Sequence, residues 1–179
     1  MKKELKKNNT KIGILGGTFD PPHKGHLFIS KIALKKFKLN KLLWVVTKKN
    51  PLKKKPYLSI KERIKLSEKI TTKEKKIFVK YFDKKIKSVN TFNMLTYIRK
   101  NEKKAKLFFL IGADNLVKFH KWKNWNKITK LAKIVIFPRH NYSIESLNSV
   151  AAKKLSKKGL VYINSKKINI SSSLIRKFW

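Results

Sequence analysis

Six short runs of branched and aromatic residues constrain the fold of this chain more than any other feature of its sequence. Unbroken apolar runs this short are typical of strands that are buried on both faces of a sheet. The runs are "IGIL" at 12–15, "LLWVV" at 42–46, "IFV" at 77–79, "LFFLI" at 107–111, "IVIF" at 134–137 and "LVYI" at 160–163. The sequence therefore predicts six buried strands.

Longer segments with helical spacing of their apolar residues separate these runs. Examples are Leu27, Ile29, Ile32, Ala33, Leu34 and Phe37, or Leu147, Val150, Ala151 and Leu155. Strands that alternate with helices imply right-handed crossovers and a parallel sheet. We predict one Rossmann-like α/β domain over residues 11–179, with a doubly wound, mostly parallel sheet and helices on both faces, preceded by a basic tail at 1–10.

Composition narrows the class of protein further. Hydrophobic residues make up 41% of the chain, enough for a core, and the chain has no cysteine, which excludes disulfides, thiolate catalysis and cysteine zinc sites. No run approaches the roughly 18 apolar residues of a membrane span, and the N-terminus lacks the apolar segment of a secretory signal. We expect a cytoplasmic protein with no membrane partner.

The net charge of +38 comes from 47 basic and nine acidic residues. Only four of the basic residues are arginines, so 43 are lysines, spread along the whole chain. A nucleic-acid reader would be expected to use more arginine, because the guanidinium grips phosphates and guanine edges at two points. We interpret the lysines as a solvated surface and expect no specific nucleic acid partner. A non-enzymatic RNA-binding role remains the alternative.

The stretch "KIGILGGTFDPPHKGH" at 11–26 has the pattern of a ligand-binding turn. In parallel sheets ligands bind beyond the carboxyl ends of the strands, and Gly16 and Gly17 follow the first strand there, where backbone can approach a ligand closely. Gly25 and His26 then open the first long helix, whose N-terminal N–H groups favour an anion. Asp20 is expected to be structural within the turn.

His23 and His26 lie three residues apart at this helix start. Imidazoles can donate hydrogen bonds to phosphate oxygens and, when protonated, stabilise charge that develops in phosphoryl transfer. A metal site is the first alternative, with His120, His140 or a carboxylate as third ligand. The second alternative is that both histidines are structural and bind no ligand.

The C-terminal "ISSSLIRK" at 170–177 forms a second candidate anion site. Ser172 and Ser173 begin a short helix, and Arg176 lies one turn further on, so hydroxyls, N–H groups and a guanidinium point the same way. An ordinary serine cap beside a surface arginine is the alternative.

"GGTFDPPHKGH" resembles the signature of the nucleotidyltransferase superfamily that carries the HxGH motif, and "ISSSLIRK" resembles the second motif of that superfamily, written ISSTxIR. Between them, "FFLIGADNLVKFHKW" resembles the nicotinate mononucleotide adenylyltransferases. The resemblance implies that Asp114 binds the adenosine ribose and that Trp122 stacks on the pyridine ring. An N-cap for Asp114 and a packed surface anchor for Trp122 are the alternatives.

Two further stretches resemble this family less closely. "NPLKKKPYLSIKERIKL" is similar to the loop after the second strand, with Asn50, Pro51 and Lys53 bordering the substrate and Arg63 on the following helix. "SVNTFNML" places Thr91 near the nicotinate, but Asn93 and Met94 depart from the family pattern, as does Lys123 after Trp122. These departures fall among the predicted nicotinate contacts and not among those predicted for ATP.

The resemblance implies transfer of the adenylyl group of ATP to nicotinate mononucleotide, with His23, His26 and Arg176 as catalytic residues. It implies a set of ATP-binding residues: Gly16, Gly17, Thr18, Phe19, Gly25, Gly112, Asp114, Ser172, Ser173 and Arg176. It implies nicotinate mononucleotide binding by Asn50, Lys53, Thr91 and Trp122. Mg²⁺ is expected to arrive on the ATP phosphates, with no metal held by the protein.

Phosphopantetheine adenylyltransferase is the nearest alternative enzyme, although it usually has threonine where this chain has His23. A fragment of a class I aminoacyl-tRNA synthetase fits less well, because no KMSKS-like loop is present. A homo-oligomer is compatible with the sequence. The central prediction is that the loop after the first strand and the serine-rich motif near the C-terminus converge on one triphosphate.

Overall fold

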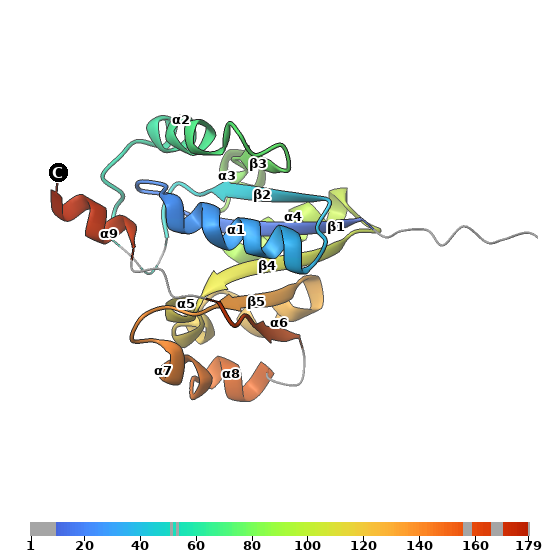
Figure 1. The fold of residues 1–179 in the computed structure, drawn as a ribbon. Helices are drawn as coiled ribbons and strands as arrows, with labels where there is room; N and C mark the ends of the chain where they lie inside the picture. The colour runs from blue at the N-terminus through green and yellow to red at the C-terminus, as the bar shows by residue number, and fades with distance from the viewer. Residues whose placement is uncertain (1–9, 51, 53, 156–158, 166–169, 179) are drawn as a thin grey trace, which may run out of the picture.

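The computed structural model describes residues 10–50, 52, 54–155, 159–165 and 170–178. Six strands form one sheet in the order β3-β2-β1-β4-β5-β6, and every pairing is parallel (Figure 1). The strands are β1 (Lys11–Gly17), β2 (Lys41–Val46), β3 (Ile77–Lys80), β4 (Lys106–Gly112), β5 (Lys133–Phe137) and β6 (Leu160–Tyr162). All six predicted strands are present, and the predicted doubly wound α/β fold is confirmed.

The helices connect consecutive strands and close the chain. They are α1 (Lys24–Lys36), α2 (Ile60–Thr71), α3 (Asp83–Ile86), α4 (Thr91–Asn101), α5 (Ala113–Val117), α6 (Trp125–Leu131), α7 (Ser143–Leu147), α8 (Val150–Leu155) and α9 (Ser172–Ile175), with 3₁₀ turns η1 (Phe119–Lys121) and η2 (Arg176–Phe178). The chain winds outward from β1 to β3, then returns to β4 on the other side of β1. Ligands bind at such a switch point, beyond the carboxyl ends of β1 and β4.

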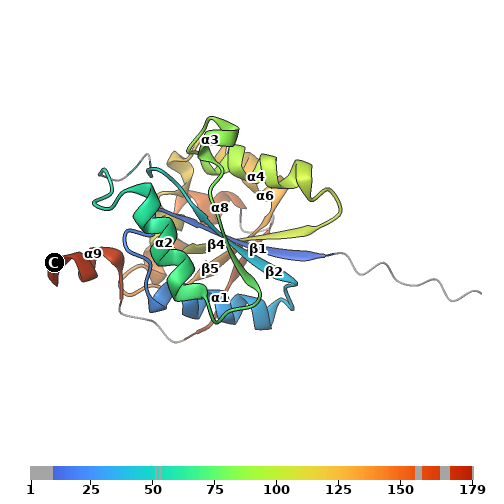
Figure 2. The ribbon, with the colours of Figure 1, turned by 90° about the horizontal axis from the view of Figure 1, so that it is seen from above.

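The sheet separates two apolar cores because successive side chains of a strand point to opposite faces. Phe108 packs in the core under α1 and α2, whereas its neighbour Phe109 packs in the core under α4, α5, α6 and α8. Figure 2 shows the two helical layers on either side of the sheet. Burial on both faces explains why the strand sequences are unbroken apolar runs rather than alternating ones.

The helical segment expected around Leu147–Leu155 is two short helices, so that prediction was wrong in part. Ser149 interrupts it: its Oγ accepts the Ala152 N–H at 3.1 Å and so caps the start of α8. Ala151 and Leu155 are buried as expected, but Leu147 and Val150 are each 55% exposed. Spacing alone could not separate one helix from two that meet at an angle.

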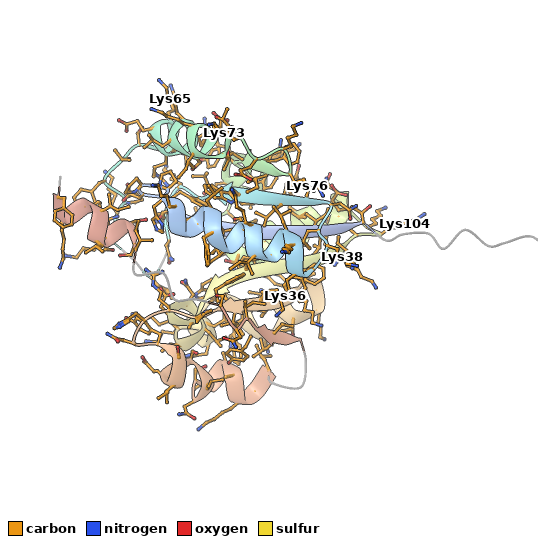
Figure 3. All side chains as sticks on the ribbon, in the orientation of Figure 1. Lys36, Lys38, Lys65, Lys73, Lys76 and Lys104 are labelled. Atoms are coloured by element: carbon orange, nitrogen blue, oxygen red, sulfur yellow. The ribbon has the colours of Figure 1, made fainter. Side chains whose placement is uncertain are left out.

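The lysines lie on the outside of the molecule. Among the described residues no lysine is buried, and Figure 3 shows the labelled ones pointing outward from α2 and from the end of the sheet where the strands begin. Residues 1–9 of the expected basic tail lie outside the described residues, while the Thr10 carbonyl already accepts the Lys106 N–H at 2.8 Å. In the described part of the chain, no helix has the length and apolar character needed to cross a membrane.

Candidate active site

The loop at 18–23, here the front loop, carries the chain from the carboxyl end of β1 to α1. Gly16 is exposed and Gly17 half-buried, so the end of β1 opens to solvent at the switch point. Phe19 adopts φ 49° and turns its ring into the core, where it stacks on Trp44 with centroids 4.9 Å apart and planes at 16°. Phe19 therefore anchors the turn through its side chain, and only its backbone can face a nucleotide.

The two histidines cap α1 reciprocally. The Gly25 N–H donates to His23 Nδ1 at 3.1 Å, and the His23 N–H donates to His26 Nδ1 at 3.2 Å. The ring centroids lie 3.8 Å apart, and the His26 ring also packs on Phe19 at 4.8 Å. A Cβ on Gly25 would lie 2.9 Å from the His23 ring and 2.8 Å from Ile170, so only glycine fits between these groups.

These caps determine which nitrogen of each neutral imidazole carries its proton. Because each Nδ1 accepts a backbone N–H, the neutral ring must carry its proton on Nε2. His23 is 8% exposed, and its burial together with the positive charge of Arg139 lowers its pKa from 6.5 to about 4. His23 is therefore a neutral Nε2–H donor at neutral pH, and the structural and functional interpretations of this histidine are compatible.

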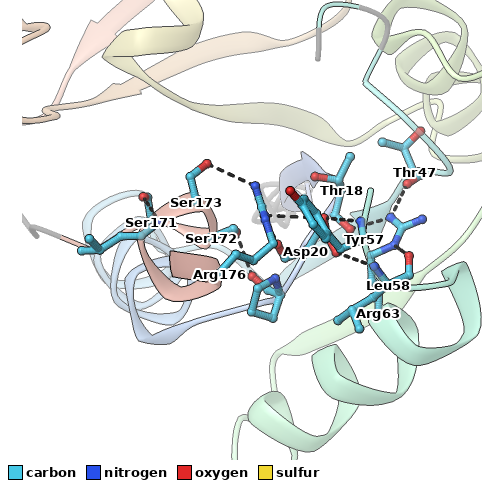
Figure 4. A network of polar contacts seen from close by, with 12 residues as sticks. Thr18, Asp20, Thr47, Tyr57, Leu58, Arg63, Ser171, Ser172, Ser173 and Arg176 are labelled. Atoms are coloured by element: carbon cyan, nitrogen blue, oxygen red, sulfur yellow. Dashed lines mark hydrogen bonds and ion pairs between the residues drawn. The ribbon is translucent and has the colours of Figure 1, made fainter. Parts of the chain in front are cut away.

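The C-terminal motif at 170–177 packs directly on the front loop. Ser172 Oγ donates to the Pro21 carbonyl at 2.8 Å, and Arg176 Nη1 donates to the Asp20 carbonyl. Ser171 caps α9 by accepting the Leu174 N–H at 3.1 Å. The front loop and the C-terminal motif therefore lie together, as the sequence predicted (Figure 4).

Asp20 and Arg63 form the polar centre of this contact (Figure 4). Asp20 is 4% exposed, and its carboxylate accepts the N–H groups of Tyr57 and Leu58 at 2.9 and 3.0 Å. Arg176 Nη1 lies 3.5 Å from Asp20 Oδ2. The structural role expected for Asp20 agrees with these bonds.

Arg63 is 2% exposed and donates to four backbone carbonyls. Its acceptors are Leu58 at 3.1 Å, Thr18 at 2.6 Å, Thr47 at 2.7 Å and Lys48 at 3.0 Å. Burial lowers the pKa of this guanidinium, while the nearby carboxylates of Asp20 and Asp83 oppose that shift. Arg63 thus joins the front loop to the segments that leave β2 and enter α2.

A cavity of about 350 Å³ lies between the segment that follows β5 and the C-terminal motif. Its lining is mainly basic and hydroxylic: Arg139, His140, Asn141, Ile170, Ser171, Ser173, Leu174 and Lys177. Ser173 belongs to the predicted ATP-binding set, whereas the site prediction did not include Arg139. Its position two residues after a buried strand, at the ligand-binding edge of a parallel sheet, is the signal that could have found it.

Arg139 also lies near Asp114, the residue predicted to bind the adenosine ribose. Its Nη1 lies 3.8 Å from Asp114 Oδ1, at the carboxyl end of β4. The Asp114 carboxylate folds back over Gly112, so a Cβ there would displace it. Gly112 is the N-cap residue of α5. Asp114 therefore lies in the first turn of that helix and is not its N-cap.

The predicted nicotinate residues are spread over three elements. Thr91 is the first residue of α4, and Asn50 accepts the Leu52 N–H at 2.9 Å within its own turn. Trp122 packs edge-on to Phe109, with centroids 6.2 Å apart, and tilted on Phe119 at 4.9 Å. Lys53 and Pro51 lie outside the described residues.

Metal-binding side chains do not gather here. Over the described ranges, no group of three histidine or carboxylate side chains could hold a metal ion. The two carboxylates nearest the predicted phosphates, Asp20 and Asp114, already face Arg176 and Arg139. The donor set therefore fits a magnesium ion carried by a triphosphate better than one held by the protein.

The comparisons with known proteins define the class of this chain. The profile of the cytidylyltransferase-like family matches residues 14–178. The chain belongs to this family, and it is a nucleotidyltransferase. The match contains the front loop, the two histidines and the C-terminal motif.

Curated relatives define the family more narrowly. A protein of Pelagibacter ubique (strain HTCC1062), named "Probable nicotinate-nucleotide adenylyltransferase", is 46% identical over 173 residues, which are 97% of this chain and 96% of the relative. One of Ruegeria sp. (strain TM1040) with the same name is 38% identical over 79% of this chain and 75% of its own length. The chain belongs to the nicotinate-nucleotide adenylyltransferase family.

Solved structures share the fold. Nicotinic acid mononucleotide adenylyltransferase of Plasmodium falciparum, complexed with NaAD, aligns with TM-score 0.74 at 22% identity, over 94% of this chain and 83% of that one. A Vibrio parahaemolyticus protein, whose structure is titled "Putative Nicotinate-nucleotide Adenylyltransferase", aligns with TM-score 0.65 at 20% identity, over 94% of this chain and 85% of that one. The predicted Rossmann-like architecture is thus shared with both solved structures.

Proposed function

We propose that this protein transfers the adenylyl group of ATP to nicotinate mononucleotide, which yields nicotinate adenine dinucleotide and pyrophosphate in NAD biosynthesis. The observation that carries the proposal is the contact between the front loop and the C-terminal motif, where Ser172 and Arg176 bond to the backbone of Pro21 and Asp20. The full-length relative that shares 46% of its residues supports the choice of substrates. A basic RNA-binding protein without activity is not adopted, because the family is one of enzymes.

The proposed reaction is a single in-line displacement. A 5′-phosphate oxygen of the mononucleotide forms a bond to the α-phosphorus of ATP, and the bond from that phosphorus to the bridging oxygen of pyrophosphate breaks. The attacking oxygen is already an anion near neutral pH, so no general base is needed. Catalysis then comes from positioning and from stabilising negative charge.

The two histidines suit this task. Because Nδ1 of each ring accepts a backbone N–H, each ring carries a proton on Nε2, the kind of donor that a phosphate oxygen accepts. We assign them to α- and β-phosphate oxygens. A fixed donor that needs no reorganisation contributes about 3 kcal/mol to transition-state stabilisation.

The leaving pyrophosphate would bind at the C-terminal motif. We assign Ser172, Ser173 and Arg176 to its oxygens: Ser173 and Arg176 supply hydroxyl and guanidinium donors, and Ser172 orients the motif through its bond to Pro21. Arg139 and Lys177 add positive charge around the adjoining cavity. The backbone of Gly16, Gly17, Thr18 and Phe19 lines the nucleotide, and Asp114 binds the ribose. Mg²⁺ on the triphosphate would neutralise part of the charge of the leaving group.

Trp122, Thr91 and Asn50 are proposed to contact the mononucleotide. A flat indole suits a flat pyridinium, because the electron-rich ring face attracts a cation. The two parts of the site are neighbours at Gly16. A Cβ placed on Gly16 would lie 3.6 Å from the Phe109 ring, and Trp122 packs on that same ring.

Pyrophosphate release by the purified protein tests the proposal. ATP and Mg²⁺ are mixed with nicotinate mononucleotide, nicotinamide mononucleotide or phosphopantetheine in separate reactions. We expect release with nicotinate mononucleotide, with the amide as the poorer substrate. Release with phosphopantetheine alone, or with none of the three, would contradict the proposal.

A further inference from the structure

Tyr57 is an exposed aromatic residue that lies against the C-terminal motif. Its side chain is 76% exposed, and the guanidinium carbon of Arg176 lies 4.9 Å from the centroid of its ring. This separation is within the range of a cation–π interaction. The sequence prediction gave Tyr57 no role, and the function proposed above does not use it.

Main-chain contacts position Tyr57 independently of its side chain. The Tyr57 N–H donates to Asp20 Oδ2, and the Leu58 N–H donates to Asp20 Oδ1. Arg63 Nε donates to the Leu58 carbonyl at 3.1 Å. A substitution that removes only the ring therefore leaves the backbone of Tyr57 anchored to Asp20.

The Tyr57 ring and the hydrogen-bond acceptors Asp20 and Ser173 contact different atoms of Arg176. Nη1 donates to the Asp20 carbonyl, and Nη2 donates to Ser173 Oγ at 3.3 Å. These bonds use N–H groups of the guanidinium, whereas the ring of Tyr57 lies under its central carbon. Figure 4 shows Arg176 with Ser173 on one side and Tyr57 and Asp20 on the other.

This difference matters when a triphosphate binds. The Asp20 carboxylate competes with phosphate for the N–H groups of Arg176, because both are anionic acceptors. The ring of Tyr57 does not compete, since it contacts the central carbon of the guanidinium and carries no charge. Contact with Tyr57 can persist while the edge of the guanidinium turns from Asp20 to phosphate.

We propose that Tyr57 is a positioning residue for ATP: its ring, which lies under the central carbon of the Arg176 guanidinium, keeps that group in place while its N–H groups bind the triphosphate. The inference rests on the proposed role of Arg176 as a phosphate ligand. It adds to the phosphate site a residue from the segment that precedes α2, about 120 residues from the C-terminal motif in the sequence.

Calorimetric titration with ATP and Mg²⁺, without the mononucleotide, tests this inference. Tyr57→Leu removes the aromatic face and should weaken ATP binding about two- to five-fold, the range expected for an exposed cation–π contact. Tyr57→Phe keeps the face and should bind ATP like the parent. Phe78→Leu, at an exposed aromatic residue on β3, is the matched control and should also bind like the parent.

A double-mutant cycle with Arg176→Ala shows whether Tyr57 acts through Arg176. Tyr57→Leu should cause no further loss of ATP affinity in the Arg176→Ala background. Equal losses in both backgrounds, or a Tyr57→Phe variant as weak as Tyr57→Leu, would overturn the inference. So would a Tyr57→Leu variant that binds ATP as the parent does.

The two proposals fail in different ways. A parent protein that binds ATP, shows the Tyr57 effect and releases no pyrophosphate with nicotinate mononucleotide would refute the proposed reaction alone. Normal pyrophosphate release without the Tyr57 effect would refute only the role of Tyr57. A parent that does not bind ATP would overturn both.

Discussion

The phosphate side and the nicotinate side of the proposed site are held in different ways. On the phosphate side, Asp20, Arg63, Ser172 and Arg176 bond to backbone atoms of other segments, so the chain path itself is fixed. On the nicotinate side, Trp122 is held by ring packing and Asn50 by a bond within its own turn. The phosphate side is thus built from main-chain geometry, and the nicotinate side from side chains on separate elements.

This contrast predicts which side tolerates substitution better. On the phosphate side the front loop must cap α1 and meet the C-terminal motif, and Gly25 fits there because a Cβ would lie 2.9 Å from the His23 ring and 2.8 Å from Ile170. Side chains that contact a ligand without fixing the path of the chain can be exchanged more easily.

Replacement of His23 should give the largest effect and tests the phosphate side directly. His23→Asn keeps an N-cap acceptor but removes the Nε2–H donor, so kcat should fall about a hundredfold while thermal stability stays near that of the parent. Steady-state pyrophosphate release and thermal unfolding measure the two quantities. A variant that keeps a third or more of the parent kcat would refute the assigned role.

Removal of Arg63 should show that backbone contacts hold the phosphate side. Arg63→Met leaves four carbonyls without their donor, so the free energy of unfolding should drop by about 3 kcal/mol and ATP affinity should fall as well. Arg99→Met is the control, because Arg99 also donates to two carbonyls, those of Ala105 and Leu131, but away from the site. Urea unfolding and ATP titration give the comparison.

The control separates the two contributions. Arg99→Met should lower stability without changing ATP affinity. If both variants lose ATP affinity equally, the effect is one of general stability, and the contrast between the two sides of the site would fail.

The low pKa of His23 predicts a pH-dependent stability. Between pH 4 and 6.5 the unfolded chain binds a proton at this residue and the folded chain does not, so lowering the pH stabilises the unfolded state. From pH 7 to pH 5 the free energy of unfolding should fall by about 2 kcal/mol on account of His23. Urea unfolding at both pH values measures it, and His23→Asn should lose this part of the dependence.

Replacement of Trp122 should give a smaller effect than the His23 and Arg63 variants and tests the nicotinate side. Trp122→Leu should raise the KM for nicotinate mononucleotide about tenfold and leave the KM for ATP unchanged, because stacking on the pyridinium is lost. Trp125→Leu is the matched control, because Trp125 also packs on Phe119, with ring centroids 6.5 Å apart. Equal changes in both variants would mean that Trp122 acts only through packing.

The strands and the two motifs could be predicted from the sequence because their signals are local. Six apolar runs identified all six strands, and the strands Lys11–Gly17 and Lys106–Gly112 exceed their runs by only a few residues. The Ser171 cap and the first turn of α1 follow from residue types within a few positions. The break at Ser149 was missed because a polar residue inside an apolar spacing does not reveal whether a helix continues.

Residues that act at long range were harder to predict. The sequence did not show what Arg63 and Arg139 contact, because their partners lie on other segments of the chain. Arg63 donates to the Thr18 carbonyl, and Arg139 lies near Asp114. Tyr57 could not be assigned a role from the sequence, because an isolated aromatic residue in a basic loop has no local pattern that points to Arg176. Such contacts depend on how the segments pack.

The sequence by itself determined the alternation of strands and helices, the glycine and histidine turn after β1 and the serine cap near the end, because periodicity and capping involve neighbours along the chain. Only the tertiary structure decided the strand order β3-β2-β1-β4-β5-β6 and the meeting of Asp20 with Arg176. It also decided the protonation of His23, since burial and the charge of Arg139 lower that pKa. Burial and distant charges arise only when segments remote in sequence pack together.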